Sequence, residues 1–223
     1  AVLFFQELGI TTLRFNFAGS QIGQGHQELQ EVEEAANYLL QQSSCVKYIL
    51  LVGYSYGSLI VSSASASVPQ CIGVVSIAPP FGVQHWLLLF HSSHHLKRGQ
   101  KIANLPRLFV IGTQDNLTSE DVFHETVLSF PKECTTGAIL KDTNHFFIRR
   151  EKDLMAIVGR WLMDAYPDAS DLTVLREMNF DHILKARSKE TIQTLERGLK
   201  DNNGSGYRNM ADYDCTGALH PFS

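Results

Sequence analysis

Three residue types that together activate a hydroxyl group occur in this chain in the order serine, aspartate, histidine. Ser55 lies in the pentapeptide Gly53–Gly57 (GYSYG), and Asp115 and His145 follow it in two later polar segments. A serine hydroxyl is a weak nucleophile unless a histidine accepts its proton, and a carboxylate must orient that histidine. The three residues therefore predict covalent acyl transfer through Ser55.

The sequence around Ser55 predicts the sharp turn that such a nucleophile needs. The apolar run Tyr48–Val52 predicts a buried strand, and Ser58–Val61 with the small residues after it predicts a helix. Glycines at 53 and 57 leave room for a strained serine whose hydroxyl stands exposed between strand and helix. The pattern G-x-S-x-G alone is common, so an ordinary glycine-rich turn with an unreactive serine is the alternative.

Two further apolar runs predict where the partners of the serine lie. Leu108–Gly112 leads into the loop of Asp115, and Gly137–Leu140 leads into the loop of His145. Both runs predict buried strands. Because the carboxyl ends of parallel strands meet at one edge of a sheet, both loops are expected beside Ser55.

Other residues compete for these roles. Asp142 shares the loop of the histidine and would have to fold back on it, while Asp121 falls in a predicted helix. His91 and His94 form an H-x-x-H pattern, but no nearby carboxylate or cysteine completes a zinc site. We therefore expect no metal and no other cofactor.

The order of elements predicts an α/β fold. Continuously apolar strands that alternate with helices are typical of a doubly wound, mostly parallel sheet covered on both faces, here over residues 1–166. Residues 167–223 contain two weakly patterned segments and an aperiodic end, which predict a helical appendage and a disordered tail. The expected helices are Ala1–Leu8, Gln27–Gln42, Thr118–Phe130, Lys152–Ala165, Asp171–Phe180 and Ser188–Lys200, and the expected strands are Thr11–Phe17, Tyr48–Val52, Cys71–Ala78, Leu108–Gly112 and Gly137–Leu140.

The composition is that of an ordinary globular protein. Of 223 residues, 44% are hydrophobic and 19% are charged, with a net charge of −4, which suits one sizeable core. This charge predicts neither nucleic acid nor an anionic membrane as a partner, and no apolar run reaches membrane-spanning length. Four scattered cysteines without a C-x-x-C pattern predict reduced thiols in a cytoplasmic protein. No pattern indicates the oligomeric state.

Together with the order of Ser55, Asp115 and His145, the sequence of positions 1–165 resembles the α/β-hydrolase superfamily. The resemblance is greatest to its small, nearly lidless serine hydrolases, which are described as esterases or as peptidase-like. The segment Arg14–Gly25 (RFNFAGSQIGQG) is similar to the family pattern R-[FY]-N-[FS]-R-G-x-G-x-S-x-G. It departs at Ala18, Gln21 and Gly23, which replace an arginine, a glycine and a serine. The other matching segments are Gly53–Ile60, Gly112–Asp115 and Asn144–Phe147.

An acyl transfer of this kind also needs donors for the oxyanion. The N–H of Tyr56, the residue after the nucleophile, is one expected donor, and a loop earlier in the chain supplies the second. By comparison with the superfamily, the first three strands and that loop are missing from this sequence. This gap and the altered Arg14–Gly25 segment leave open a catalytically impaired, hydrolase-like interaction domain.

The expected substrate is a small molecule that carries an acyl group. The insert Phe81–Leu105 stands where the superfamily places its lid, and its shortness predicts an open site. Trp86 is expected either to line an acyl pocket or to belong to a buried helix, and Tyr54 either contacts substrate or only packs. We expect hydrolysis of a small carboxylic ester or thioester, with a peptidase or an acyltransferase on the same triad as the alternative.

Overall fold

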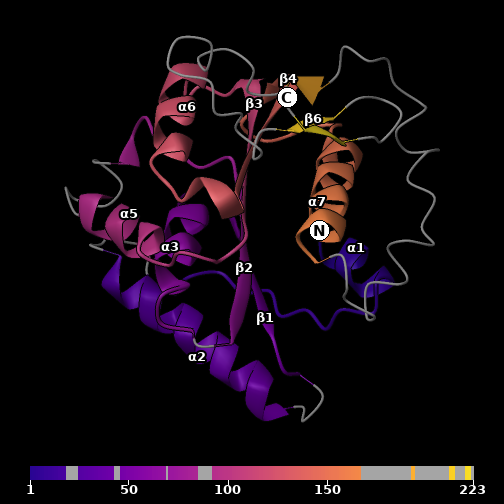
Figure 1. Cartoon of the computed structure of the whole chain (residues 1–223). Coiled ribbons are helices and arrows are strands. Elements are labelled where there is room, and N and C mark those ends of the chain that lie inside the picture. The colour runs from indigo at the N-terminus through magenta and orange to yellow at the C-terminus, as the bar shows by residue number, and fades with distance from the viewer. Residues whose placement is uncertain are drawn as a thin grey trace.

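The computed structural model describes residues 1–18, 25–42, 46–68, 70–84, 92–166, 192–193, 211–213 and 219–221. Its centre is a sheet of strand order β1-β2-β3-β4-β5, in which β1 to β4 are parallel and β5 is antiparallel to β4 (Figure 1). The strands are β1 (Ile49–Tyr54), β2 (Cys71–Ile77), β3 (Arg107–Gln114), β4 (Thr135–Asn144) and β5 (Ile192–Gln193), with a separate antiparallel pair β6 (Ala211–Tyr213) and β7 (Leu219–Pro221). The helices are α1 (Val2–Glu7), α2 (His26–Gln42), α3 (Tyr56–Ala64), α5 (Ser92–Gln100), α6 (Glu120–Leu128) and α7 (Glu151–Ala165), with a 3-10 turn η1 (Lys132–Cys134).

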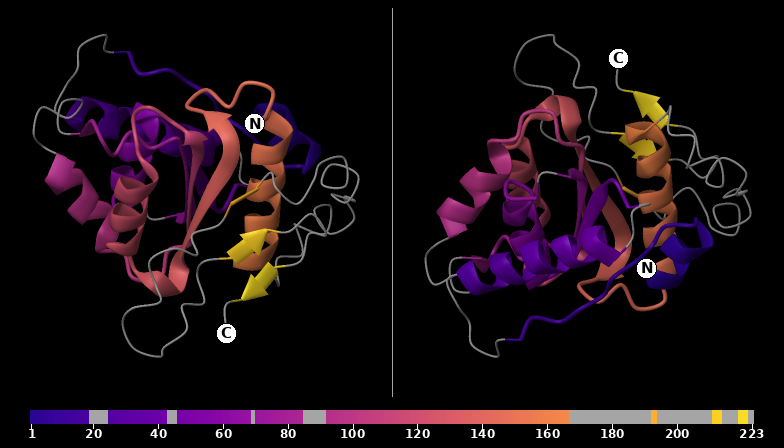
Figure 2. Two further views of the ribbon diagram at one scale, coloured as in Figure 1. Left: turned by 90° about the horizontal axis from the view of Figure 1, so that it is seen from above. Right: turned by 90° about the horizontal axis from the view of Figure 1, so that it is seen from below.

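Each face of the sheet packs against its own hydrophobic core. Helices α2, α3, α5 and α6 cover one face, and α1 and α7 cover the other (Figure 2). Along β3, Phe109 and Ile111 belong to the first core, while Leu108 and Val110 belong to the second. This strand is continuously apolar because its alternating side chains are buried on both faces. The predicted doubly wound, mostly parallel sheet is therefore confirmed.

Most of the elements expected from the sequence in the described ranges are present, but Thr11–Phe17 is not a strand. Residues Thr11–Phe15 of this segment line a groove of about 370 Å³ and face the outer edge of β1 across it instead of pairing with that edge. Leu13 and Phe15 consequently remain 40% and 43% exposed. Alternating apolar residues form a strand only where a neighbouring backbone completes the hydrogen bonds, and in the described part none does so here.

The prediction for the carboxyl-terminal region differs from the structure at two points. In the tail expected to be disordered, β6 (Ala211–Tyr213) pairs with β7 (Leu219–Pro221). Ile192–Gln193, inside the helix expected over Ser188–Lys200, pairs with β4 as a strand. The rest of that range and the helix expected over Asp171–Phe180 lie outside the described residues. The division of the chain at residue 166 stays a prediction.

A buried arginine fixes the insert between β2 and β3. Arg107, the first residue of β3, is fully buried and donates to the carbonyl oxygens of Gly99 and Leu105 at 2.7 Å and of Ile102 at 2.8 Å. Gly99 lies in the last turn of α5, where carbonyl groups have no partner within the helix. The guanidinium group thus joins the end of α5 to the sheet.

The ends of β3 and β4 approach closely at Gly112. The register of the two strands shifts between Gly112 and Gln114, which pairs with Asn144. A Cβ atom on Gly112 would lie 2.0 Å from the carbonyl oxygen of Thr143. Only glycine fits there, and the contact places the two strand ends, and hence the loops that follow them, side by side.

We expect Gly112→Ala to lower the free energy of unfolding by about 2 kcal/mol or more, because the added methyl group forces β3 and β4 apart. Urea unfolding followed by circular dichroism measures this loss. Gly57→Ala is the matched control, since a Cβ there meets only a ring carbon of Phe17 at 3.8 Å. The control should stay within about 1 kcal/mol of the unchanged protein. Equal stability of the two variants would contradict the close contact.

Candidate active site

Ser55 occupies the turn between β1 and α3 in a strained conformation. Its φ is +52° and its ψ is −126°, a left-handed backbone that residues other than glycine rarely adopt. Such a residue costs of order 1–3 kcal/mol and persists only where its surroundings hold it. Here its N–H donates to the carbonyl of Ile77 at 2.8 Å, and its carbonyl accepts from the Ser58 hydroxyl at 2.6 Å. The predicted strand, turn and helix around Ser55 are all present.

Gly53 makes this turn possible. A Cβ on Gly53 would lie 2.5 Å from the carbonyl oxygen of Gly57 and 2.6 Å from Val61. The first turn of α3 therefore packs directly on the backbone of β1. This close packing leaves the Ser55 hydroxyl at the edge of the sheet where the parallel strands end.

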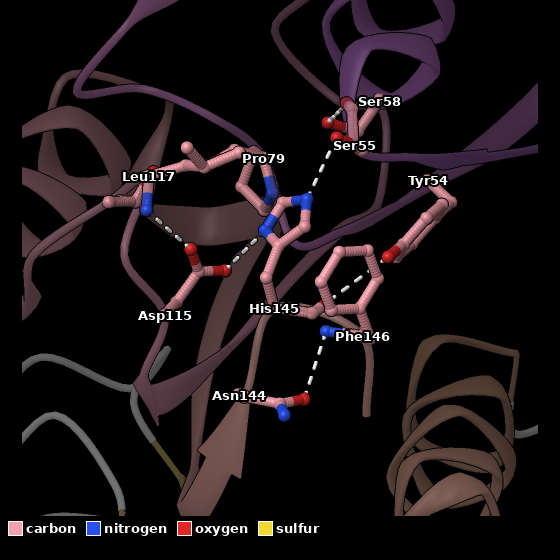
Figure 3. Close-up of polar contacts among 10 residues, drawn as sticks. Tyr54, Ser55, Ser58, Pro79, Asp115, Leu117, Asn144, His145 and Phe146 are labelled. Atoms are coloured by element: carbon pink, nitrogen blue, oxygen red, sulfur yellow. Dashed lines mark hydrogen bonds and ion pairs between the residues drawn. The ribbon is translucent and has the colours of Figure 1, made fainter. Parts of the chain in front are cut away.

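His145 is the first residue after β4 and joins Ser55 to Asp115 (Figure 3). Its Nε2 lies 2.9 Å from the Oγ of Ser55, and its Nδ1 lies 2.9 Å from an Oδ of Asp115. A carboxylate only accepts hydrogen bonds, so the imidazole proton belongs on Nδ1. Nε2 is then the acceptor for the hydroxyl proton of Ser55, which is the arrangement that a general base requires.

The carboxylate of Asp115 is fully buried and both of its oxygens have donors. One accepts from the N–H of Leu117 at 2.8 Å, and the other faces His145 (Figure 3). The loop is in turn joined to the end of β2, because Thr118 donates its hydroxyl to the carbonyl of Pro79 at 2.6 Å. These bonds fix the direction from which Asp115 meets the imidazole.

The loop of His145 is anchored on both sides of the histidine. The side chain of Asn144 accepts from the N–H of Phe146 at 3.1 Å, and its carbonyl accepts from the N–H of Phe147 at 3.1 Å. Phe147 has a φ of +52° and a ring that is 2% exposed in the core under α7. Burial of this ring holds the strained turn and thereby the backbone of His145.

Tyr56 presents its backbone to the site and its side chain to the interior. It is the first residue of α3, so its N–H has no acceptor within the helix and is placed to donate beside Ser55. Its ring packs edge-on against Phe17. Burial and the facing carboxylate of Glu28, itself buried in α2, raise the pKa of the Tyr56 hydroxyl. The side chain therefore packs in the core that α2 and α3 share.

The rival residues are placed elsewhere. Asp142 is exposed, and its N–H donates to the hydroxyl of Thr113. Asp121 lies exposed in the first turn of α6. His91 and Trp86 lie outside the described residues. Within the described ranges, no group of three metal-ligating side chains is arranged to hold a metal ion.

One contact at the site has no signal in the sequence. The hydroxyl of Tyr54 donates to the backbone carbonyl of His145 at 3.2 Å, across 91 positions of the chain. The sequence marks Tyr54 only as a neighbour of the nucleophile. The sequence likewise gives no signal for the burial of Glu28, because an acidic residue in a first helical turn usually faces solvent.

The described part of the chain shows no helix that is both long enough and apolar enough to cross a bilayer.

The two cysteines in the described part, Cys71 and Cys134, are free thiols, and burial raises the pKa of Cys71 to about 11. A thiol with this pKa remains protonated near neutral pH and is a poor nucleophile.

Comparison with known proteins identifies the fold. No protein-family model matches the chain, and no curated protein matches it in sequence. Among solved structures, an alpha-beta serine hydrolase homologue from Coxiella burnetii is 22% identical with a TM-score of 0.56, over 70% of this chain and 71% of the other. The esterase Pf2001 of Pyrococcus furiosus is 18% identical with a TM-score of 0.60, over 73% and 74%. The esterase domain of a Rhodothermus marinus protein is 15% identical with a TM-score of 0.56, over 72% and 80%. The chain therefore has the α/β-hydrolase fold, which by itself does not specify an activity.

The arrangement around His145 predicts a proton NMR signal. The Nδ1–H, held by the buried Asp115 carboxylate, should give a slowly exchanging resonance far downfield. Asp115→Asn should abolish it, whereas the matched variant Asp142→Asn should retain it because Asp142 is exposed and bonded elsewhere. Loss of the resonance in Asp142→Asn alone would reassign the acid.

Proposed function

We propose that the protein is a serine hydrolase that cleaves a small carboxylic ester or thioester through an acyl-enzyme on Ser55. The observation that carries the proposal is the unbroken chain of two 2.9 Å contacts from the Ser55 Oγ through His145 to Asp115. The fold likeness to esterases from Pyrococcus furiosus and Rhodothermus marinus supports it. All three residues fall within residues 1–166, which we propose as the catalytic domain.

The first half of the reaction forms the acyl-enzyme. Ser55 Oγ attacks the acyl carbon while Nε2 of His145 takes the hydroxyl proton. The acyl carbon becomes tetrahedral, and its carbonyl oxygen becomes an oxyanion. The N–H of Tyr56 donates to this oxyanion. His145 then returns the proton to the leaving alcohol or thiol as the bond to carbon breaks. Asp115 stabilises the imidazolium that exists between these two proton transfers.

The second half of the reaction releases the acid. A water molecule gives its proton to Nε2 of His145 and attacks the acyl-enzyme carbon, again through an oxyanion held by the Tyr56 N–H. Collapse expels Ser55, which recovers its proton from the imidazole. Within the described residues, the mechanism uses these side chains, the Tyr56 N–H and water. We propose a small acyl substrate as the partner of the protein.

The surroundings of the triad favour an apolar substrate group. Tyr54 and Phe146 are 45% and 67% exposed, and their ring centroids lie 5.6 and 5.5 Å from that of the His145 imidazole. Exposed apolar side chains beside a nucleophile bury area against an apolar acyl or alcohol group. We propose Tyr54 as a substrate-binding residue on this ground, and the same role for Trp86 stays a prediction.

A fluorophosphonate probe tests the nucleophile. Such a probe phosphonylates an activated serine, so the folded protein should be labelled at Ser55, as peptide mass spectrometry can show. Ser55→Ala should abolish labelling, and His145→Ala should slow it by about 10³-fold or more, since the base is lost. Ser129→Ala is the matched control, because the hydroxyl of that exposed serine donates to Thr126 and accepts from Gln100, both outside the site, and its loss should leave labelling unchanged. A folded protein that is not labelled would instead favour a hydrolase-like interaction domain.

Substrate panels separate the reaction classes. We expect short-chain p-nitrophenyl esters and acyl thioesters to be hydrolysed with kcat/KM at least about 100-fold above that for the matching anilides, because no described feature is specific to an amide leaving group. Faster cleavage of the anilides would point to a peptidase, and transfer to added alcohol in preference to water would point to an acyltransferase.

A further inference from the structure

Tyr54 connects the strand of the nucleophile directly to the histidine. It is the last residue of β1, immediately before Ser55, and its hydroxyl donates to the backbone carbonyl of His145 at 3.2 Å (Figure 3). Its ring centroid lies 5.6 Å from that of the imidazole. The tyrosine therefore contacts both the main chain and the ring of the same residue.

This contact acts where the sheet no longer restrains His145. The pairing of β4 with β3 reaches Asn144, so His145 lies one residue beyond the hydrogen-bonded ladder. Strands β2 and β3 separate β1, which Ser55 follows, from the end of β4. A bond from Tyr54 to the His145 carbonyl spans that gap and couples the nucleophile turn to the backbone that carries the imidazole.

The position of this backbone determines the geometry at both imidazole nitrogens. Nδ1 and Nε2 each make a 2.9 Å contact, and a displacement of the His145 backbone lengthens one contact or both. Proton transfer requires a distance near hydrogen-bond length between the two heavy atoms. Such a displacement therefore reduces the fraction of molecules in which Nε2 can accept the Ser55 proton.

We propose that Tyr54 is a positioning residue, whose hydroxyl holds the main chain of His145 so that Nε2 remains at the Oγ of Ser55. The inference rests on the proposed function and separates two uses of one side chain. The hydroxyl serves His145, and the half-exposed ring is left to face substrate.

The hydroxyl is a donor over the whole useful pH range. Burial and the carboxylate of Asp115 raise the pKa of Tyr54 above its ordinary value near 10, so the neutral, donating form persists at neutral and mildly alkaline pH. The contribution of the hydroxyl should therefore be constant between about pH 7 and pH 9.

Tyr54→Phe removes the hydroxyl and keeps the ring. We expect the second-order rate of fluorophosphonate labelling at Ser55, and kcat for p-nitrophenyl acetate, to fall about 3- to 10-fold, the effect of one neutral hydrogen bond. KM should not change, and the ratio to the unchanged protein should be the same at pH 7 and pH 9. Tyr54→Leu should in addition raise KM, because it removes the ring. Tyr38→Phe, on an exposed tyrosine of α2, is the matched control and should show no effect.

The outcomes separate this inference from the proposed function. If the unchanged protein is labelled and Tyr54→Phe reacts as fast as Tyr38→Phe, positioning by Tyr54 is wrong while the hydrolase proposal stands. A raised KM at constant kcat in Tyr54→Phe would also overturn it, since the hydroxyl would then bind substrate. If the unchanged protein is not labelled, the hydrolase proposal fails. In that case the downfield Nδ1–H resonance of His145 still tests whether Tyr54 positions the histidine. The resonance should broaden in Tyr54→Phe but not in Tyr38→Phe. An unaltered resonance in Tyr54→Phe would overturn the positioning role.

Discussion

The parallel pairing of β1 to β4 is the constraint on which the rest of the structure depends. Parallel strands end at the same edge, so residues that follow β1, β3 and β4 meet although 90 positions separate Ser55 from His145. The two cores hold these strands from both faces. The close approach at Gly112 then sets the final spacing between the loops of Asp115 and His145.

The site stores strain that this rigid sheet can sustain. Ser55 and Phe147 both adopt a left-handed backbone, and each is held by groups outside the site. A hydrogen bond to the carbonyl of Ile77 holds Ser55. Burial of the Phe147 ring in the core under α7 holds Phe147. Each strained residue costs of order 1–3 kcal/mol, which is comparable to what the surrounding hydrogen bonds and buried ring contribute. Functional sites are where such backbone strain is concentrated. Here it lies at the residue proposed as nucleophile and in the loop of its proposed base.

The sequence was sufficient to predict those features that depend on local signals. The turn at Ser55 follows from glycine spacing between a strand and a helix, and the loops of Asp115 and His145 follow from two apolar runs. Contacts between distant strands could not be predicted in this way. The alternation in Thr11–Phe17 gives no information on whether a neighbouring edge pairs with it, and in the described part none does. The bond from Tyr54 to the His145 carbonyl depends on the order of the strands in space, which residue types do not reveal.

The fold and the site support the hydrolase proposal in different ways. The likeness to structures that are 15–22% identical shows the fold, and many chemistries share this architecture. The direction of the hydrogen bonds is more specific. Asp115 accepts from Leu117 through one oxygen and faces Nδ1 of His145 with the other, so the lone pair of Nε2 is left to face Ser55. A histidine that only filled the core would satisfy its nitrogens with any nearby groups. Here one nitrogen meets a buried carboxylate and the other a strained serine at the sheet edge, which is the arrangement that the proposed proton transfer requires.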